Sequence, residues 1–138
     1  GNFTAKFSQD YFCNSDDIYK QLDFSENIIV DARANDRFEG KVVEPRKGIR
    51  SGHIPHSVNL PYSDLLKNGV LLPKNILEDK FKKINRQNKP MIMSCGSGVT
   101  ACILALTADI CGYQQFKVYD GSWSEWGADH TLPVITTD

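Results

Sequence analysis

The sequence has no strong excess of charge and no long apolar run. Its 16 basic and 17 acidic residues give the 138-residue chain a formal net charge of −1, which offers no reason to expect a nucleic acid or an anionic membrane as partner. No apolar run approaches the ~20 residues that a membrane-spanning helix needs. The first residues carry neither a basic segment nor an apolar core, so we also expect no secretory signal peptide.

Cysteine is scarce as well, with four residues in the chain. Cys95, Cys102 and Cys111 are separated by six and eight residues, which is neither a disulfide framework nor the spacing of zinc ligands. We therefore expect no metal and a reducing compartment, the cytoplasm or the mitochondrion. Cys102 and Cys111 are expected to be buried small hydrophobic residues.

What is present is the composition of one soluble α/β domain. Short apolar segments at 28–30, 57–60, 90–94 and 116–119 are typical of strands, and they alternate with predicted helices that begin near Ser15, Tyr62, Pro73 and Val99. This alternation predicts a parallel sheet with helices on both faces. A long polar loop at 32–51 and a Trp-rich turn at 122–126 follow two of the strands. Ligands of such sheets bind beyond the carboxyl ends of the strands, so we expect both segments to lie beside Cys95.

Cys95 lies at the end of an apolar strand and is followed by Gly96-Ser97-Gly98 and an apolar helix. Glycines allow the backbone to curl tightly around the sulfur, and the N–H groups of such a turn favour negative charge. The thiol is then expected to ionise more easily than a free cysteine, whose pKa is about 8.5. We interpret Cys95 as a nucleophile in an anion-binding loop; the alternative is a buried structural thiol.

The loop itself carries no basic side chain between Ser94 and Tyr113. Cysteine-dependent phosphatases need an arginine six residues after the nucleophile, where this chain has Ala101, so phosphatase chemistry is disfavoured. Attack of a thiolate on a neutral sulfur requires less positive charge in the loop, because only a single negative charge on sulfur has to be stabilised. Six basic residues in the 33–50 loop supply positive charge, and one or two of its arginines could orient an acid substrate (Arg33, Arg37, Lys41, Arg46, Lys47 and Arg50).

Other polar residues leave alternatives open. Ser97 is a candidate proton relay or a turn-stabilising serine. His53 is interpreted as a structural hydrogen-bonding residue, and His56 and His130 as surface residues. Trp123 and Trp126 are most simply packing residues, although one of them could form a wall of the site.

Five blocks in order together resemble the rhodanese superfamily, and more narrowly the C-terminal domain of the 3-mercaptopyruvate sulfurtransferases. They are Asp31-Ala32-Arg33 with Arg37-Phe38, Glu44-Pro45-Arg46, Gly48 to Pro55 with Ser57 to Pro61, Cys95-Gly96-Ser97-Gly98-Val99-Thr100-Ala101, and Tyr119 to Trp126. The resemblance implies a rhodanese-like α/β fold with a central, mostly parallel five-stranded sheet and helices on both faces. It also implies that residues 1–138 form a single rhodanese domain, the C-terminal half of a two-domain tandem enzyme.

The same resemblance implies roles for the site residues. Cys95 is the nucleophile that forms a persulfide, and Ser97 joins a proton relay. Arg37 and Arg46 bind the substrate, together with the loop residues Gly96, Gly98, Val99 and Thr100. The expected donor is 3-mercaptopyruvate, pyruvate is released, and the acceptor is cyanide or a thiol such as thioredoxin. No metal or organic cofactor is implied.

Two alternatives remain, a thiosulfate sulfurtransferase and a catalytically idle rhodanese module. Thiosulfate-specific rhodaneses resemble Cys-Arg-Lys-Gly, and this chain has Gly96 and Ser97 at the two charged positions. The family usually has proline at the position of Val43 and glycine at that of His56. An N-terminal rhodanese domain, the expected partner, would supply the Asp and His that complete the relay.

Overall fold

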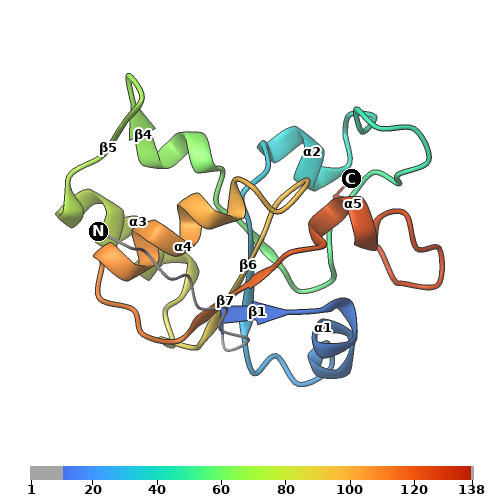
Figure 1. Cartoon of the computed structure of the whole chain (residues 1–138), viewed down its shortest axis with the longest axis horizontal. Helices are drawn as coiled ribbons and strands as arrows, with labels where there is room; N and C mark the ends of the chain where they lie inside the picture. The colour runs from blue at the N-terminus through green and yellow to red at the C-terminus, as the bar shows by residue number, and fades with distance from the viewer. Residues whose placement is uncertain (1–10, 138) are drawn as a thin grey trace, which may run out of the picture.

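The computed structural model describes residues 11–137, and the first ten residues, on which the signal-peptide prediction rests, lie outside that range. Its centre is a sheet of five parallel strands in the order β1-β7-β6-β2-β3 (Figure 1). The strands are β1 (Phe12–Cys13), β2 (Ile28–Asp31), β3 (Val58–Asn59), β6 (Met91–Ser94) and β7 (Phe116–Tyr119). This confirms the predicted parallel five-stranded sheet.

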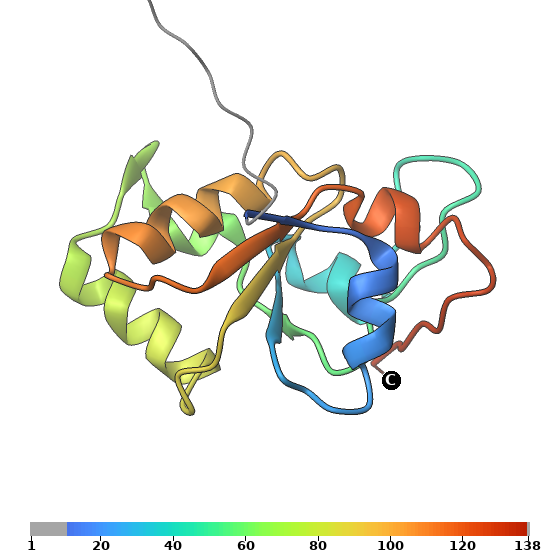
Figure 2. The same cartoon turned by 60° about the horizontal axis from the view of Figure 1, so that its bottom comes forward.

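Helices cover both faces of the sheet, as predicted (Figure 2). Residues on one face of the strands, among them Val30 and Met93, form a core with the 3₁₀ helix η2 (Tyr62–Leu65) and with α3 (Lys74–Ile84) and α4 (Ala101–Ile110). Residues on the other face, such as Ile29 and Ile92, pack against α1 (Ser15–Gln21) and α5 (Ser122–Trp126). The alternation along each strand therefore divides the apolar side chains between two cores.

Two of the predicted helices are stabilised by features that are visible in the sequence, the spacing of apolar residues in α3 and a cap at the start of α1. In α3, Leu77 and Phe81 lie one turn apart and are buried, while the charged residues face outward. The helix α1 begins at Ser15, as predicted, and its cap is Asn14: the Asn14 side chain accepts the N–H of Asp17, and the Asp17 carboxylate accepts the N–H of Asn14. This reciprocal capping box takes up two N–H groups that would otherwise have no partner.

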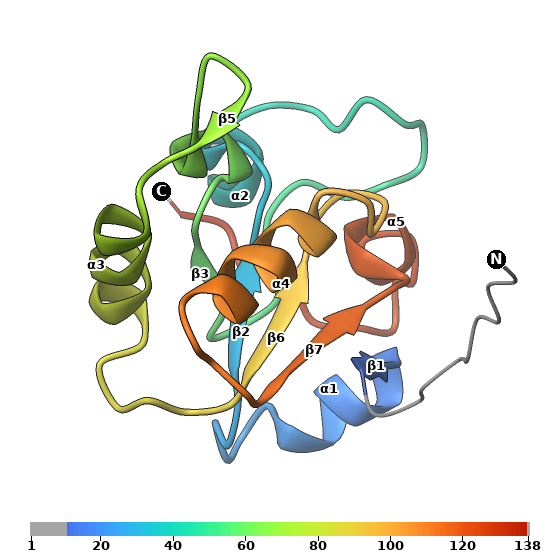
Figure 3. The same ribbon diagram turned by 60° about the vertical axis from the view of Figure 1, so that its left-hand side comes forward.

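Two segments that the sequence predicts as irregular contain short helices. The 32–51 loop includes α2 (Asn35–Glu39), and the Trp-rich turn is α5. The chain also has a small antiparallel hairpin, β4 (Leu66–Lys67) and β5 (Val70–Leu71), where a short helix was expected to continue. Figure 3 shows this hairpin projecting from the edge of the molecule, away from the strands. None of the helices within residues 11–137 is long and apolar enough to cross a bilayer.

Candidate active site

The loop after β6 is held in place by the start of α5. The N–H groups of Trp123 and Ser124 donate to the carbonyls of Cys95 and Gly96, at 2.9 and 2.8 Å. The N–H of Cys95 donates to the hydroxyl of Ser122 at 3.1 Å, and that hydroxyl donates to the Tyr119 carbonyl at 2.7 Å. The Trp-rich segment and the cysteine loop therefore meet at the carboxyl ends of the strands, as the strand order predicts (Figure 1).

The Cys95 sulfur lies beneath this loop and faces a main-chain donor. The residue is 1% exposed, and the N–H of Gly98 points at its Sγ from 2.9 Å. Gly98 has a φ of +95°, and a Cβ at this position would stand 2.5 Å from the carbonyl oxygen of Asp120. Only glycine fits this turn, and the turn aims the N–H at the sulfur. The predicted contact between a loop amide and the sulfur is present, while the nucleophilic role of the thiol remains a proposal.

Arg37, on α2, reaches the loop from the side. Its Nη2 lies 3.0 Å from the point where Gly96 would carry a Cβ. Its Nε and Nη2 donate to the two carboxylate oxygens of Glu44, at 3.0 and 2.8 Å. The pKa of Arg37 is raised above its ordinary value, mainly by this hydrogen bond and in smaller part by the charges of Glu44, Asp31 and Cys95. The guanidinium is thus fixed at the loop with one edge on Glu44.

Arg46 lies on the same side of the loop. A small cavity of about 160 Å³ brings it together with Arg37 and with two residues of the cysteine loop, Gly96 and Ser97. Ser97 and Arg46 are exposed, and Arg37 is partly exposed. Cys95 is buried and is not among the residues that line the cavity. The structure therefore places four of the predicted site residues around one cavity, and two of them directly follow Cys95 in the chain.

Two other arginines of the basic segment have structural partners. Arg33 is buried, forms a bidentate pair with Asp31 and lies 4.6 Å from the centre of the Trp123 ring. Arg50 donates to four main-chain carbonyls between Trp126 and Leu132 and so fastens the segment after α5. Of the four arginines in this segment, only Arg37 and Arg46 line the cavity.

The remaining loop residues differ in exposure. Val99 is 72% exposed and Thr100 is half-buried, so in this conformation neither lines the cavity. The prediction that Cys102 is buried is wrong: it is exposed on α4, and its thiol lies 3.6 Å from the Gly98 carbonyl. Cys111 is half-buried rather than buried. An apolar helix on the surface buries one side only, and Cys102 lies on the other.

The histidines and tryptophans have the structural roles that the sequence indicates. His53 stacks on Phe38 with ring centres 3.9 Å apart, and its Nδ1 lies 2.7 Å from the Phe38 carbonyl. Both tryptophans are buried in the core beneath α5. Within residues 11–137 no group of three or more His, Cys, Asp or Glu residues is arranged to hold a metal ion.

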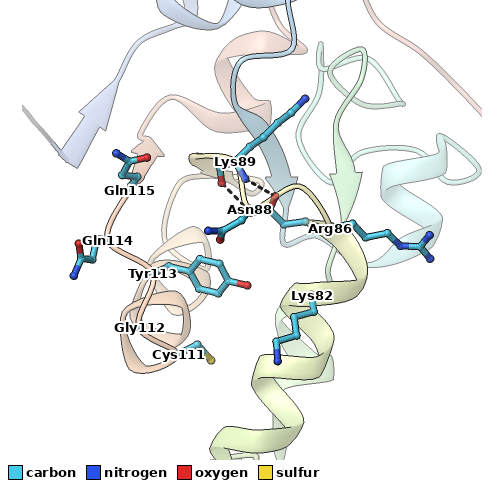
Figure 4. Close-up of a pocket in the computed structure, with 10 residues that line it drawn as sticks. Lys82, Arg86, Asn88, Lys89, Cys111, Gly112, Tyr113, Gln114 and Gln115 are labelled. Carbon is cyan, nitrogen blue, oxygen red and sulfur yellow. Dashed lines mark hydrogen bonds between the residues drawn. The ribbon is translucent and has the colours of Figure 1, made fainter.

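Two larger cavities lie at the opposite, amino ends of the strands. One, of about 730 Å³, is lined by the end of α3 and the turn before β7 (Figure 4). In it Lys82 points toward the side of Cys111 and Tyr113, Arg86 points away, and Lys89 donates to the Ser25 carbonyl at 3.0 Å. The other, of about 750 Å³, lies between α1 and β7. Neither contains a residue of the cysteine loop, so neither belongs to the candidate site.

Comparison with known proteins fits this geometry. The model of the rhodanese-like domain family matches residues 14–129. The chain belongs to the rhodanese family. It is 45% identical over 127 residues to the 3-mercaptopyruvate sulfurtransferase of Mus musculus, covering 90% of this chain and 42% of that protein. It is 39% identical over 135 residues to the 3-mercaptopyruvate sulfurtransferase of Escherichia coli K12, covering 97% and 48%.

Solved structures agree with this rhodanese fold. The Tum1 protein from Saccharomyces cerevisiae superimposes with a TM-score of 0.80 at 29% identity, over 94% of this chain and 48% of that one. The rhodanese chain therefore spans less than half the length of these relatives.

Sequence reasoning missed the parts played by Glu44 and Ser122. Glu44 is 5% exposed and contacts two arginines, and Ser122 joins the Cys95 main chain to β7. Both belong to blocks that resemble the family. The available signal was their position next to Arg46 and Trp123, but residue type alone does not tell a buried carboxylate or hydroxyl from a surface one.

Proposed function

We propose that this domain is the catalytic, C-terminal half of a tandem 3-mercaptopyruvate sulfurtransferase. The observation that carries the proposal is the Gly98 N–H at 2.9 Å from the Cys95 sulfur, in a loop whose residues Gly96 and Ser97 line a cavity together with Arg37 and Arg46. A thiolate needs such a donor, and an acid substrate needs the arginines. A purely structural thiol needs neither.

In the first half-reaction the Cys95 thiolate attacks the thiol sulfur of 3-mercaptopyruvate. A bond forms between the two sulfurs, and the bond between the donor sulfur and its carbon breaks. The electron pair of the broken bond passes to that carbon, which takes up the proton of the donor thiol. The products are pyruvate and a Cys95 persulfide anion, so atoms and charge balance.

The site residues have separate roles in this step. Arg37 and Arg46 bind the carboxylate and keto group of the donor, and Ser97 takes part in moving the proton to the leaving carbon. The loop of Gly96, Gly98, Val99 and Thr100 surrounds the sulfur, where main-chain N–H groups stabilise the thiolate and the persulfide. Because Cys95 is 1% exposed, the donor reaches the sulfur only when the surrounding loop opens.

In the second half-reaction an acceptor removes the outer sulfur. Cyanide takes it as thiocyanate and regenerates the Cys95 thiolate. A dithiol such as reduced thioredoxin releases it as hydrogen sulfide and becomes a disulfide, which again balances atoms and electrons. An N-terminal rhodanese domain completes the proton relay with its Asp and His. The site proposed here requires no metal or organic cofactor, and the compartment is the cytoplasm or the mitochondrion.

Thiosulfate is the alternative donor, and an idle module is the alternative outside catalysis. One relative, from Arabidopsis thaliana, is named thiosulfate/3-mercaptopyruvate sulfurtransferase 1, mitochondrial, and is 39% identical over 138 residues. A cysteine loop without basic side chains favours the singly charged mercaptopyruvate over the doubly charged thiosulfate. The observed Gly98–Cys95 contact disfavours the idle module, which has no use for it.

The deciding experiment is the intact mass of the full-length protein after incubation with 3-mercaptopyruvate. We expect a gain of one sulfur atom, mapped to the Cys95 peptide, together with release of pyruvate. The Cys95→Ser variant should show neither, because a serine alkoxide is not available at neutral pH. Persulfide formed only from thiosulfate would support the alternative donor, and no modification by either donor would support the idle module.

The arginine roles have their own test. Arg37→Ala and Arg46→Ala should each raise KM for mercaptopyruvate by roughly tenfold, the loss of one charge-assisted hydrogen bond to the carboxylate. Lys47→Ala is the matched control, since Lys47 is exposed, lies next to Arg46 and does not line the cavity. Unchanged kinetics in both arginine variants would remove these residues from the site.

A further inference from the structure

Glu44 is the only acid among the residues that line the cavity beside Cys95. Its side chain is 3% exposed and is gripped by Arg37 through two hydrogen bonds of 2.8 and 3.0 Å. Its Oε1 also lies 3.5 Å from Nη1 of Arg33. One buried carboxylate is therefore shared between two guanidinium groups. A buried negative charge next to a site proposed for an anion calls for an explanation.

The charges around the cavity can be counted. Arg33 is already balanced by its bidentate partner Asp31. The cavity lining then holds two positive groups, Arg37 and Arg46, and one negative group, Glu44. The lining has a net charge of one positive unit, which matches a donor with a single negative charge. A donor with two negative charges would remain half compensated.

Resting on the proposed function, we infer that Glu44 is a specificity-determining residue that selects singly charged sulfur donors. Its carboxylate offsets the charge of Arg37 while it holds the guanidinium beside Gly96. Arg37 thus acts mainly through the direction of its N–H groups, and Arg46 supplies the uncompensated charge. 3-Mercaptopyruvate is a monoanion and thiosulfate a dianion at neutral pH, so the two donors test the inference directly.

The first variant is Glu44→Gln, which removes the charge and keeps the shape. Loosening of Arg37 affects both donors, but the added positive unit attracts the dianion twice as strongly as the monoanion. We expect the ratio of kcat/KM for thiosulfate to that for mercaptopyruvate to rise about tenfold, equivalent to about 1.4 kcal/mol. Glu44→Asp, which restores the charge, should bring the ratio back toward the wild-type value.

The matched control is Glu39→Gln. Glu39 is on α2, two residues from Arg37, and pairs with the exposed Lys41 rather than lining the cavity. The Glu39→Gln variant loses the same charge, yet its ratio of kcat/KM for thiosulfate to that for mercaptopyruvate should stay within about twofold of the wild-type ratio. Added salt screens charge, so the difference between the Glu44→Gln and wild-type ratios should shrink as ionic strength rises. A purely structural role of Glu44 would produce no such salt dependence.

A second pair of variants covers the case in which Glu44→Gln does not fold. Ser124 lines the cavity from α5 and is half-buried. Ser124→Asp adds a negative unit there without touching Glu44, and it should lower the thiosulfate ratio about tenfold, whereas Ser124→Asn should leave that ratio within twofold.

Failure of the inference is distinct from failure of the proposed function. If the wild type forms a Cys95 persulfide from mercaptopyruvate, but a folded Glu44→Gln variant moves the donor ratio by no more than twofold, charge selection by Glu44 is wrong and the proposed function stands. The same holds for an unchanged ratio in Ser124→Asp where Glu44→Gln does not fold. If the wild type uses neither donor, the proposed function fails first.

Discussion

Replacement of Gly98 by alanine tests whether the shape of the cysteine loop, rather than its composition, supports the chemistry. Gly98 has a φ of +95°, and its N–H is 2.9 Å from the Cys95 sulfur. An L-residue in this left-handed region costs about 1–2 kcal/mol. The added Cβ would also stand 2.5 Å from the Asp120 carbonyl, closer than real contacts allow, so the loop must move.

The conformational cost and the crowding together give the expected loss of stability in Gly98→Ala. Crowding against backbone adds about 1–2 kcal/mol to the conformational cost, for a total of about 2–4 kcal/mol. For a domain of this size that lowers Tm by of the order of 10 °C. Movement of the loop also pulls the N–H away from the sulfur, and loss of a hydrogen bond to a charged group should lower kcat/KM roughly 10- to 150-fold.

Gly112→Ala is the matched control. Gly112 has a φ of +89° and nothing within 4 Å of the position of its Cβ, so it carries the same conformational cost without the clash. Thermal unfolding and sulfur-transfer kinetics of the full-length protein should show that Gly112→Ala loses some stability and keeps its kcat/KM. If the Gly98 variant matched this control in Tm and stayed within threefold of it in kcat/KM, the reasoning about the loop would be refuted.

Three further predictions concern stability and thiol reactivity. Burial, with a contribution from the charge of Asp17, raises the pKa of Cys13 to about 12, so at pH 8 only about one thiol in 10,000 is ionised and iodoacetamide should modify exposed Cys102 long before Cys13. Comparable labelling of both thiols at pH 8 would contradict this assignment. In the unfolded chain Cys13 ionises at the ordinary cysteine pKa, so its burial should lower the free energy of unfolding as pH rises from about 9 to about 12. His56→Gly should stabilise the domain by about 0.5–1 kcal/mol in urea unfolding, because His56 has a φ of +65°, and a loss of stability would show that its side chain has a compensating contact. Asn14→Ala should cost about 1 kcal/mol in the same assay by removing the capping box of α1, and an unchanged midpoint would mean that the box contributes nothing.

The parts of the fold that were predictable are those with a local signal. The run Ile28-Ile29-Val30 and the strand before Cys95 are continuous apolar segments, and both are central strands of the sheet. The two residues of β1 are too few to produce a pattern. The five-residue α2 buries only Phe38 and has no side-chain cap, so neither its periodicity nor its first residue marks it as a helix.

The apolar helix after the cysteine loop shows where composition misleads. Cys102 was predicted to be buried, yet Cys102, Leu106 and Ile110 recur every four residues and form an exposed stripe on α4. Burial is decided by which side of the helix faces the sheet, and the first two turns of α4 have no polar residue that marks the outer side. The one charged residue of α4, Asp109, lies seven residues after Cys102 on the same exposed side, and it was the only sequence signal that Cys102 faces outward.

For the candidate site, sequence reasoning identified the groups but not their pairings. Cys95, Arg37 and Arg46 were identified from residue type and position, and the structure brings them to one cavity. In the sequence, Arg33 and Arg37 are two arginines of the same basic segment. Only the fold shows that Arg33 pairs with Asp31 and that Arg37 pairs with Glu44. Such pairings depend on the approach of segments within the tertiary structure, which local patterns do not record.

These pairings separate reactivity from selectivity in the chain. The loop after β6 contributes the thiol and the Gly98 N–H and carries no charge of its own. All the charged side chains that line the cavity come from α2 and the segment after it, some 50–60 residues earlier in the sequence. Because the two segments meet only at the rim of the sheet, the charge of the donor site can change without any change in the loop that holds the nucleophile. On the proposed function, the charge of Glu44 and the lack of basic side chains at Gly96 and Ser97 act together on the choice of donor, and Glu44→Gln changes the first while it leaves the second as it is.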